Sequence, residues 1–166
     1  MSPTTPSIEI VPATLAHAAA IELRAGDAME VAAMGATKDE AFRTSLARSL
    51  WAETYLVDGV PAAMVGLGLS AFVGGHGVPW LLTSPICERH KKRFLVESRR
   101  QVASMLAEVS PLKNFVHADY GRAVRWLAWL GFTLDAPVAI NGAAFIPFSM
   151  EVAASPLFLH RAGSRA

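Results

Sequence analysis

The chain has 166 residues, a net charge of +1 and one cysteine, and 52% of its residues are hydrophobic while only 17% are charged. That length is typical of one domain with a substantial core. The near-neutral charge gives no general electrostatic basis for binding nucleic acid or a membrane surface. One cysteine excludes an internal disulfide. No apolar run reaches the roughly 18 residues of a membrane span, and the N-terminus lacks the pattern of a signal peptide, so we expect a soluble intracellular domain.

The first half of the chain predicts a strand, two helices and a hairpin. Residues 8–13 alternate and are β-branched, which is typical of a strand. A helix is predicted over residues 15–35 with Thr14 as its cap, and a second helix follows the capping box of Thr37 and Glu40. Residues 51–72 predict a hairpin around the turn Asp58-Gly59.

The second half predicts strands alternating with helices. A buried strand over residues 78–84 precedes a helix that starts at Ser84-Pro85 and runs to about residue 109. Residues 112–118 predict a strand, and Asp119 caps the next helix, which Gly131 ends. Two last strands flank the turn Asn141-Gly142.

The predicted order is β-α-α-β-β-β-α-β-α-β-β, an α+β fold with one mixed sheet and helices on both faces. We divide the chain into an N-terminal arm (1–7), one domain (8–152) and a C-terminal arm (153–166).

The junction AVRWLAWLGF at residues 123–132 resembles a segment of the GCN5-related N-acetyltransferases, whose pattern Ala123, Gly131 and Phe132 match. The segments RFLVESRR (93–100) and WLAWLGF (126–132) are similar to a bacteriophage group of this family, which includes the T7-type internal virion (head-assembly) protein A. The resemblance implies the acetyltransferase fold, phage structural proteins or further copies of the chain as partners, and the host cytoplasm or the virion as location.

Enzymes of that family hold the acetyl-CoA pyrophosphate on a glycine-rich turn at a helix start, and the matching stretch SPICERHKKRFL has no glycine. A basic cluster stands there instead. Its cations oppose the helix dipole, so three interpretations stay open: a solvated face, side-chain binding of CoA phosphates, or contact with nucleic acid or an acidic protein. The cluster consists of Arg89, His90, Lys91, Lys92 and Arg93.

The resemblance places Leu127 where the family has its general-acid tyrosine, and leucine cannot donate a proton. Tyr120, at the start of the same predicted helix, is one replacement; packing at a strand-helix junction is the alternative. Asp119 and Glu53 are weak candidates for a base, and the helix cap already explains Asp119. His76 and His117 are further weak candidates for the base.

The remaining candidates concern metals, the thiol and partner contacts. The five histidines show no metal-ligand spacing, so no metal is expected. Cys87, near a helix start, could have a lowered thiol pKa, but a small buried residue is the simpler interpretation. Trp126 is expected in the core. Trp129 with Leu157 and Phe158 of the C-terminal arm are the predicted interface residues.

Two functions follow from these observations. The first is a phage virion or assembly protein that acts through protein contacts. The second is an acetyl-CoA-dependent N-acyltransferase acting on an amine of a small molecule, a protein or modified DNA. In the second case Leu82 and Thr83, at the end of their strand, would offer backbone groups to the reacting carbonyl.

Overall fold

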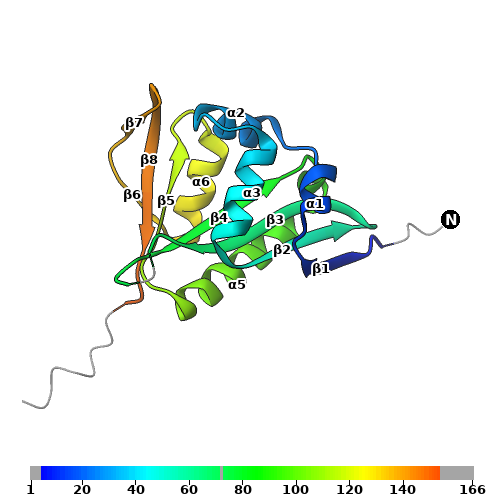
Figure 1. The fold of residues 1–166 in the computed structure, drawn as a ribbon. Helices are drawn as coiled ribbons and strands as arrows, with labels where there is room; N and C mark the ends of the chain where they lie inside the picture. The colour runs from blue at the N-terminus through cyan, green and yellow to red at the C-terminus, as the bar shows by residue number, and fades with distance from the viewer. Residues whose placement is uncertain (1–4, 72, 154–166) are drawn as a thin grey trace, which may run out of the picture.

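The computed structural model describes residues 5–71 and 73–153. These form one mixed sheet with helices on both faces, as the sequence predicts (Figure 1). The elements in chain order are β1 (Ile8–Pro12), α1 (Leu15–Ala20), α2 (Ala25–Ala33), α3 (Lys38–Arg48), β2 (Ser49–Val57), β3 (Val60–Leu69), β4 (Gly77–Thr83), α4 (Ile86–Arg89), α5 (Lys91–Glu108), β5 (Leu112–His117), α6 (Gly121–Leu130), β6 (Thr133–Leu134), β7 (Val138–Ile140) and β8 (Ala143–Met150).

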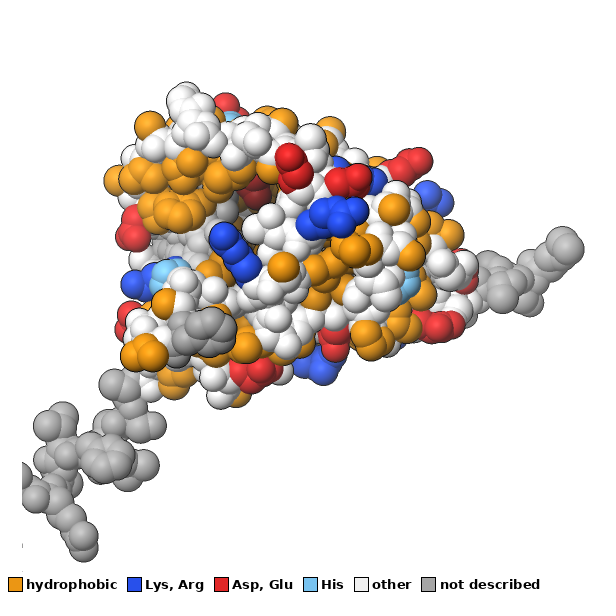
Figure 2. All heavy atoms as spheres, viewed as in Figure 1, with side chains coloured by type: hydrophobic (Ala, Val, Ile, Leu, Met, Phe, Trp, Pro, Cys, Tyr) orange, Lys and Arg blue, Asp and Glu red, His pale blue; other side chains and the backbone are white. Residues whose placement is uncertain are grey.

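The sheet runs in the order β1-β2-β3-β4-β5-β8-β6, and β7 joins the edge of β8. Its neighbours are antiparallel except β4 and β5, which run parallel and share the single register pair Gly77 and Leu112. Beyond that pair the two strands diverge. In the space-filling view the surface beside α3 is hollowed, with hydrophobic side chains above the hollow (Figure 2).

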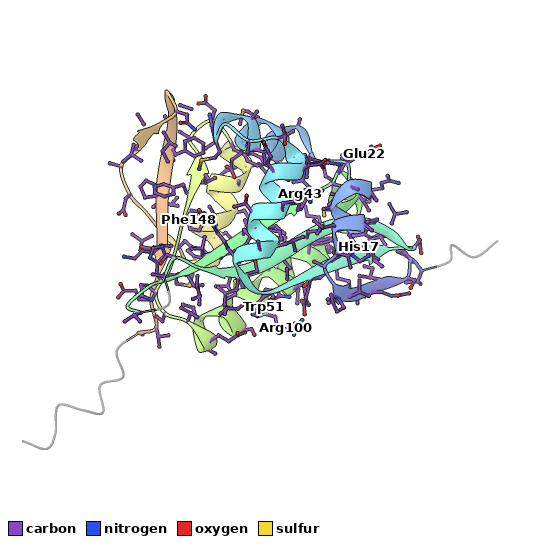
Figure 3. All side chains as sticks on the ribbon, viewed as in Figure 1. His17, Glu22, Arg43, Trp51, Arg100 and Phe148 are labelled. Carbon is purple, nitrogen blue, oxygen red and sulfur yellow. The ribbon has the colours of Figure 1, made fainter. Side chains whose placement is uncertain are left out.

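Two apolar clusters cover the two faces of the sheet. One packs α5 and α6 onto the strands through buried residues such as Met105, Leu112 and Leu127. The other packs α1 and α3 through Ile21 and Phe42. Polar bonds hold the edges of these layers: the Trp51 indole on β2 donates to Glu108 at the end of α5 over 2.9 Å, and Figure 3 shows Trp51 near the α5 side of the sheet.

The local signals in the sequence are confirmed. The Thr37-Glu40 capping box is formed with both of its bonds. The hairpin turn has φ of 49° at Asp58 and 79° at Gly59, the left-handed conformation that a two-residue hairpin turn needs. Gly131 ends α6 with φ of 102°, where a side chain would be strained.

Three predicted helix boundaries are wrong. The predicted helix 15–35 is two helices, because the chain is extended at Ile21 and the Arg24 N–H bonds to the Thr83 carbonyl over 2.8 Å. The helix expected from Ser84 is broken at His90, between α4 and α5. The N-cap of α6 is Tyr120 rather than Asp119, and no described side chain bonds to its first turn.

Candidate functional site

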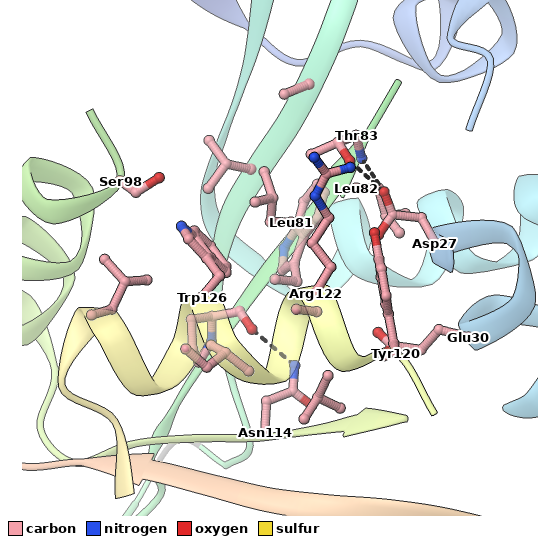
Figure 4. A pocket seen from close by; sticks show the side chains of 18 of the residues that line it. Asp27, Glu30, Leu81, Leu82, Thr83, Ser98, Asn114, Tyr120, Arg122 and Trp126 are labelled. Carbon is pink, nitrogen blue, oxygen red and sulfur yellow. Dashed lines mark hydrogen bonds between the residues drawn. The ribbon is translucent and has the colours of Figure 1, made fainter. Parts of the chain in front are cut away.

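A cavity of about 990 Å³ occupies the split between β4 and β5. Its walls come from both faces of the sheet: α2 and α3 on one side, α5 and α6 on the other. The volume is at the upper end of the range for small-molecule sites, roughly 300–1,000 Å³. Figure 4 shows the split, with Leu81 and Thr83 of β4 on one side, Asn114 of β5 on the other and Trp126 beside them. The split therefore connects the two faces of the sheet.

The backbone of β4 on the open side of the split is almost fully satisfied. Ser84 bonds to Ala62 of β3, so by antiparallel alternation the even-numbered residues of β4 face β3 and the odd-numbered residues face the split. Pro79 has no N–H, and its carbonyl accepts from the Asn114 amide over 2.8 Å. The Thr83 N–H donates to Asp27 of α2, and the Thr83 carbonyl accepts from the N–H of Arg24, the residue before α2.

Leu81 is the exception on that edge. In the described part of the chain no hydrogen bond engages its N–H, and it lies in the wall of the cavity. A free N–H at a cavity wall can donate to a carbonyl oxygen of a ligand. The expected donors were Leu82 and Thr83. The Leu82 N–H instead points toward β3, and the Thr83 N–H already donates to Asp27.

Two carboxylates of α2, three residues apart, line the cavity: Asp27 and Glu30. An i, i+3 pair lies on one face of a helix. The Asp27 carboxylate accepts from the Thr83 N–H over 2.9 Å and also from the Thr83 hydroxyl. The Glu30 carboxylate accepts from the His117 N–H over 2.7 Å. Asp27 therefore bonds to β4 and Glu30 to β5, on opposite sides of the split.

Burial raises the pKa of both carboxyl groups. The pKa of Asp27 is raised by desolvation, against which the Thr83 hydrogen bonds act. Desolvation raises the pKa of Glu30 to about 7; the bond from His117 lowers it and the charge of Asp27 raises it. A carboxylate that titrates near neutral pH in a cavity is suited to general-base chemistry.

Tyr120 reaches the cavity from the start of α6. Its ring lies against α2, where a Cβ on Gly26 would stand 2.2 Å from it, so only glycine permits this approach. The phenol is near Asp27 (Figure 4), and the charge of Arg24 also acts on it. Burial first, and then the charge of Asp27, raises the pKa of Tyr120 to about 12, so at neutral pH the hydroxyl is a hydrogen-bond donor.

The α5 side of the cavity is bounded by Lys91, Phe94 and Ser98. No described side chain caps the first turn of α5. Deeper on this side, Gln101 donates to the Tyr55 hydroxyl over 2.8 Å and to Glu53 over 2.9 Å.

The basic cluster is only partly at the cavity. Of its five residues, Lys91 lines the cavity, whereas Arg89, His90, Lys92 and Arg93 lie outside the lining. Within residues 5–71 and 73–153, none of the cluster forms an ion pair; the Glu88 carboxylate there is bound by Arg24 and Arg122 instead.

The base candidates drawn from the sequence do not line the main cavity. Glu53 is bound by Gln101 and is not in the cavity lining, and neither is Asp119, whose N–H donates to the His117 ring over 3.1 Å. His117 contributes its backbone to Glu30. His76, bonded to Ser70, borders a separate cavity of about 300 Å³.

Cys87 is buried and its thiol donates to the Ala62 carbonyl over 3.0 Å. Desolvation raises the pKa of Cys87 to about 11, the opposite of the lowering that its place near a helix start suggests. Among the described residues no three His, Cys, Asp or Glu side chains are grouped as a metal site would require.

The tryptophans of α6 differ in exposure. Trp126 is only partly buried: it packs against the core and also lines the cavity. Trp129 is 44% exposed, and the Arg99 guanidinium lies 4.0 Å from its ring centre. The predicted interface residues Leu157 and Phe158 lie outside the described residues. No helix in the described ranges is long and apolar enough to cross a membrane.

Sequence reasoning missed Asp27 and Glu30. The available signal was their spacing of three within an alanine-rich helix. Their partners Thr83 and His117 are 56 and 87 residues away, so only the fold identifies them as a site.

No protein-family model and no curated protein matches the chain. Solved structures do. The aminoglycoside acetyltransferase AAC(6′)-Ib in complex with coenzyme A is similar with a TM-score of 0.61 and 15% identity, covering 87% of this chain and 95% of that one. A GCN5-related N-acetyltransferase from Kribbella flavida gives a TM-score of 0.62 and 14% identity, with 87% and 98% covered. YncA from Salmonella typhimurium, a structure with its cofactor acetyl-CoA, gives 0.53 and 16%, with 96% and 99% covered.

The chain therefore has the fold of the GCN5-related N-acetyltransferases, as its junction at residues 123–132 predicts.

Proposed function

We propose that this protein is an N-acyltransferase that moves an acyl group from a CoA thioester to an amine. The observation that carries the proposal is the cavity in the β4–β5 split. It joins the two faces of the sheet and has the free Leu81 N–H in its wall. Such a passage lets an acyl donor and an acceptor meet from opposite sides, and holding two reactants together is a large part of catalysis.

Acetyl-CoA would supply the acyl group, activated as a thioester. The uncapped start of α5 and the Lys91 ammonium would hold its phosphates. The glycine-free stretch makes side-chain charge more important here than in a glycine-rich turn. The apolar side chains of Phe94 and Trp126 suit the uncharged arm of the donor.

The acceptor would enter from the α2 side. Glu30 would take one proton from the acceptor ammonium and so expose its lone pair. The nitrogen then forms a bond to the acyl carbon while the carbon–sulfur bond breaks, and the second amine proton passes to solvent. The Leu81 N–H would donate to the carbonyl oxygen, and the Tyr120 hydroxyl to the departing thiolate.

Calorimetry with acetyl-CoA tests the donor half of this proposal. We expect micromolar binding that Lys91→Ala weakens about fivefold, the effect of roughly 1 kcal/mol from an exposed charge. Lys92→Ala is the matched control, because Lys92 lies outside the cavity lining. An absence of binding at millimolar acetyl-CoA would refute the proposal.

A second proposal is a bacteriophage assembly protein that acts through protein contacts, in the host cytoplasm or in the virion. The sequence resemblance and the exposed Trp129 support it. Mass spectrometry of particles and assembly intermediates from the source tests it: the chain must be found in at least one of them. Removal of residues 155–166, which include Leu157 and Phe158, should impair incorporation while the domain stays folded.

A further inference from the structure

The half of the cavity that faces α2 and α3 has an uneven distribution of charge. It contains the carboxylates of Asp27 and Glu30, and an apolar wall lines the cavity beside them. The apolar wall consists of Val31, Met34, Ala36, Ala41 and Phe115. Figure 2 shows hydrophobic side chains at the rim of the hollow and an acidic side chain inside it.

The two acids are not equivalent. The Thr83 N–H and hydroxyl both donate to one oxygen of Asp27, the Tyr120 phenol lies beside that carboxyl group, and the Arg24 charge acts on it. Glu30 accepts one hydrogen bond, on Oε2, and in the described ranges no other group bonds to it. The other carboxylate oxygen of Glu30 is thus left for a cationic ligand.

We propose that the acceptor is a primary amine with a single positive charge, carried on an apolar aliphatic or aromatic body. The ammonium would pair with Glu30, and the body would lie against the apolar wall. This inference rests on the proposed function, and it deepens that function by naming the substrate class.

A polycationic acceptor does not suit the same cavity. Its second charge would lie against the apolar wall, which has no acidic side chain of its own. The other acids of the described lining, Asp27, Glu88 and Glu97, already accept hydrogen bonds from Thr83, Arg122 and Arg100. Placing an unpaired charge there costs several kcal/mol even after relaxation. The apolar body of a monoamine gains from the same contacts, about 0.8 kcal/mol for each buried methylene.

Hexylamine and 1,6-diaminohexane provide a matched test, because they differ only by the second ammonium. Thiol release from acetyl-CoA is followed with each amine. We expect kcat/KM for hexylamine to be at least about tenfold higher, the equivalent of 1.4 kcal/mol. Met34→Glu would place a carboxylate in the apolar wall and should narrow or reverse the preference. Met34→Gln, with a similar shape and no charge, should leave it unchanged.

The outcomes distinguish a failure of the inference about the acceptor from a failure of the proposed acyltransferase function. Equal use of both amines, or preference for the diamine, would overturn the inference about the acceptor. If calorimetry shows that acetyl-CoA binds but neither amine accelerates thiol release, the inference about the acceptor fails and donor binding stands. If acetyl-CoA does not bind, the proposed function itself fails. Circular dichroism of the Met34 variants checks that the fold is retained.

Discussion

Replacing Glu30 with glutamine should stabilise the protein at alkaline pH and not at acidic pH. Glu30 is a carboxyl group whose pKa burial raises from 4.5 to about 7. Between these two values the folded state binds more protons than the unfolded state, so the free energy of unfolding falls as pH rises. The stability from neutral Glu30 is fully present below pH 4.5 and is lost as pH rises through about 7.

The size of the effect follows from the same two values. The difference between 4.5 and about 7 corresponds to roughly 3 kcal/mol at 1.36 kcal/mol per pH unit. Glutamine is always neutral, and its side-chain oxygen can still accept from the His117 N–H. Glu30→Gln should therefore be close to wild type at pH 4.5 and up to about 3 kcal/mol more stable at pH 8.5.

Urea denaturation at pH 4.5, 6.5 and 8.5 measures this difference. Glu22→Gln is the matched control, because Glu22 is an exposed side chain at the outer side of the molecule (Figure 3). A difference between Glu30→Gln and wild type that stays constant across the three pH values would refute the reasoning. The same variant should lose acyl transfer, because an amide cannot take a proton from the acceptor.

Three further predictions concern single residues. Burial raises the pKa of the Cys87 thiol to about 11, so about one thiol in a thousand should be thiolate at pH 8. Iodoacetamide should therefore label Cys87 only in urea, and rapid labelling of the folded protein would contradict its burial. Gly66→Ala should cost about 1–3 kcal/mol of unfolding free energy, since the new Cβ would lie 2.6 Å from the Trp80 ring; unchanged urea denaturation would refute this. Gly26→Ala should displace the Tyr120 ring and lower the rate of transfer about as much as Tyr120→Phe; full activity in Tyr120→Phe would exclude the Tyr120 hydroxyl from the reaction.

The sequence predicts those parts of the fold that local chemistry decides. The Thr37-Glu40 box, the Asp58-Gly59 turn and the Gly131 helix end each depend on a few neighbouring residues, and each is formed. The class of fold follows because those elements leave few arrangements that bury their apolar faces.

What the sequence does not predict depends on distant partners. The helix expected over residues 15–35 breaks before Arg24 because the Arg24 N–H bonds to Thr83 of β4. The shift in the pKa of Glu30 likewise depends on burial beside β5 and on Asp27. Propensity and periodicity within a helix contain no information on either contact.

The split in the sheet explains why the site lies where it does. A strand that leaves its neighbour exposes unpaired backbone groups, which are costly unless something else binds them. Here Asn114 of β5 bonds to Pro79, and Asp27 with the Arg24 N–H bonds to Thr83. The segment formed by Arg24 and α2, which bonds to the open edge of β4 at Thr83, is thus also the one that supplies the acidic side chains. Leu81, between these two bonded positions, keeps its N–H for a ligand. The folding requirement of the edge strand and the chemistry of the cavity therefore depend on the same few contacts.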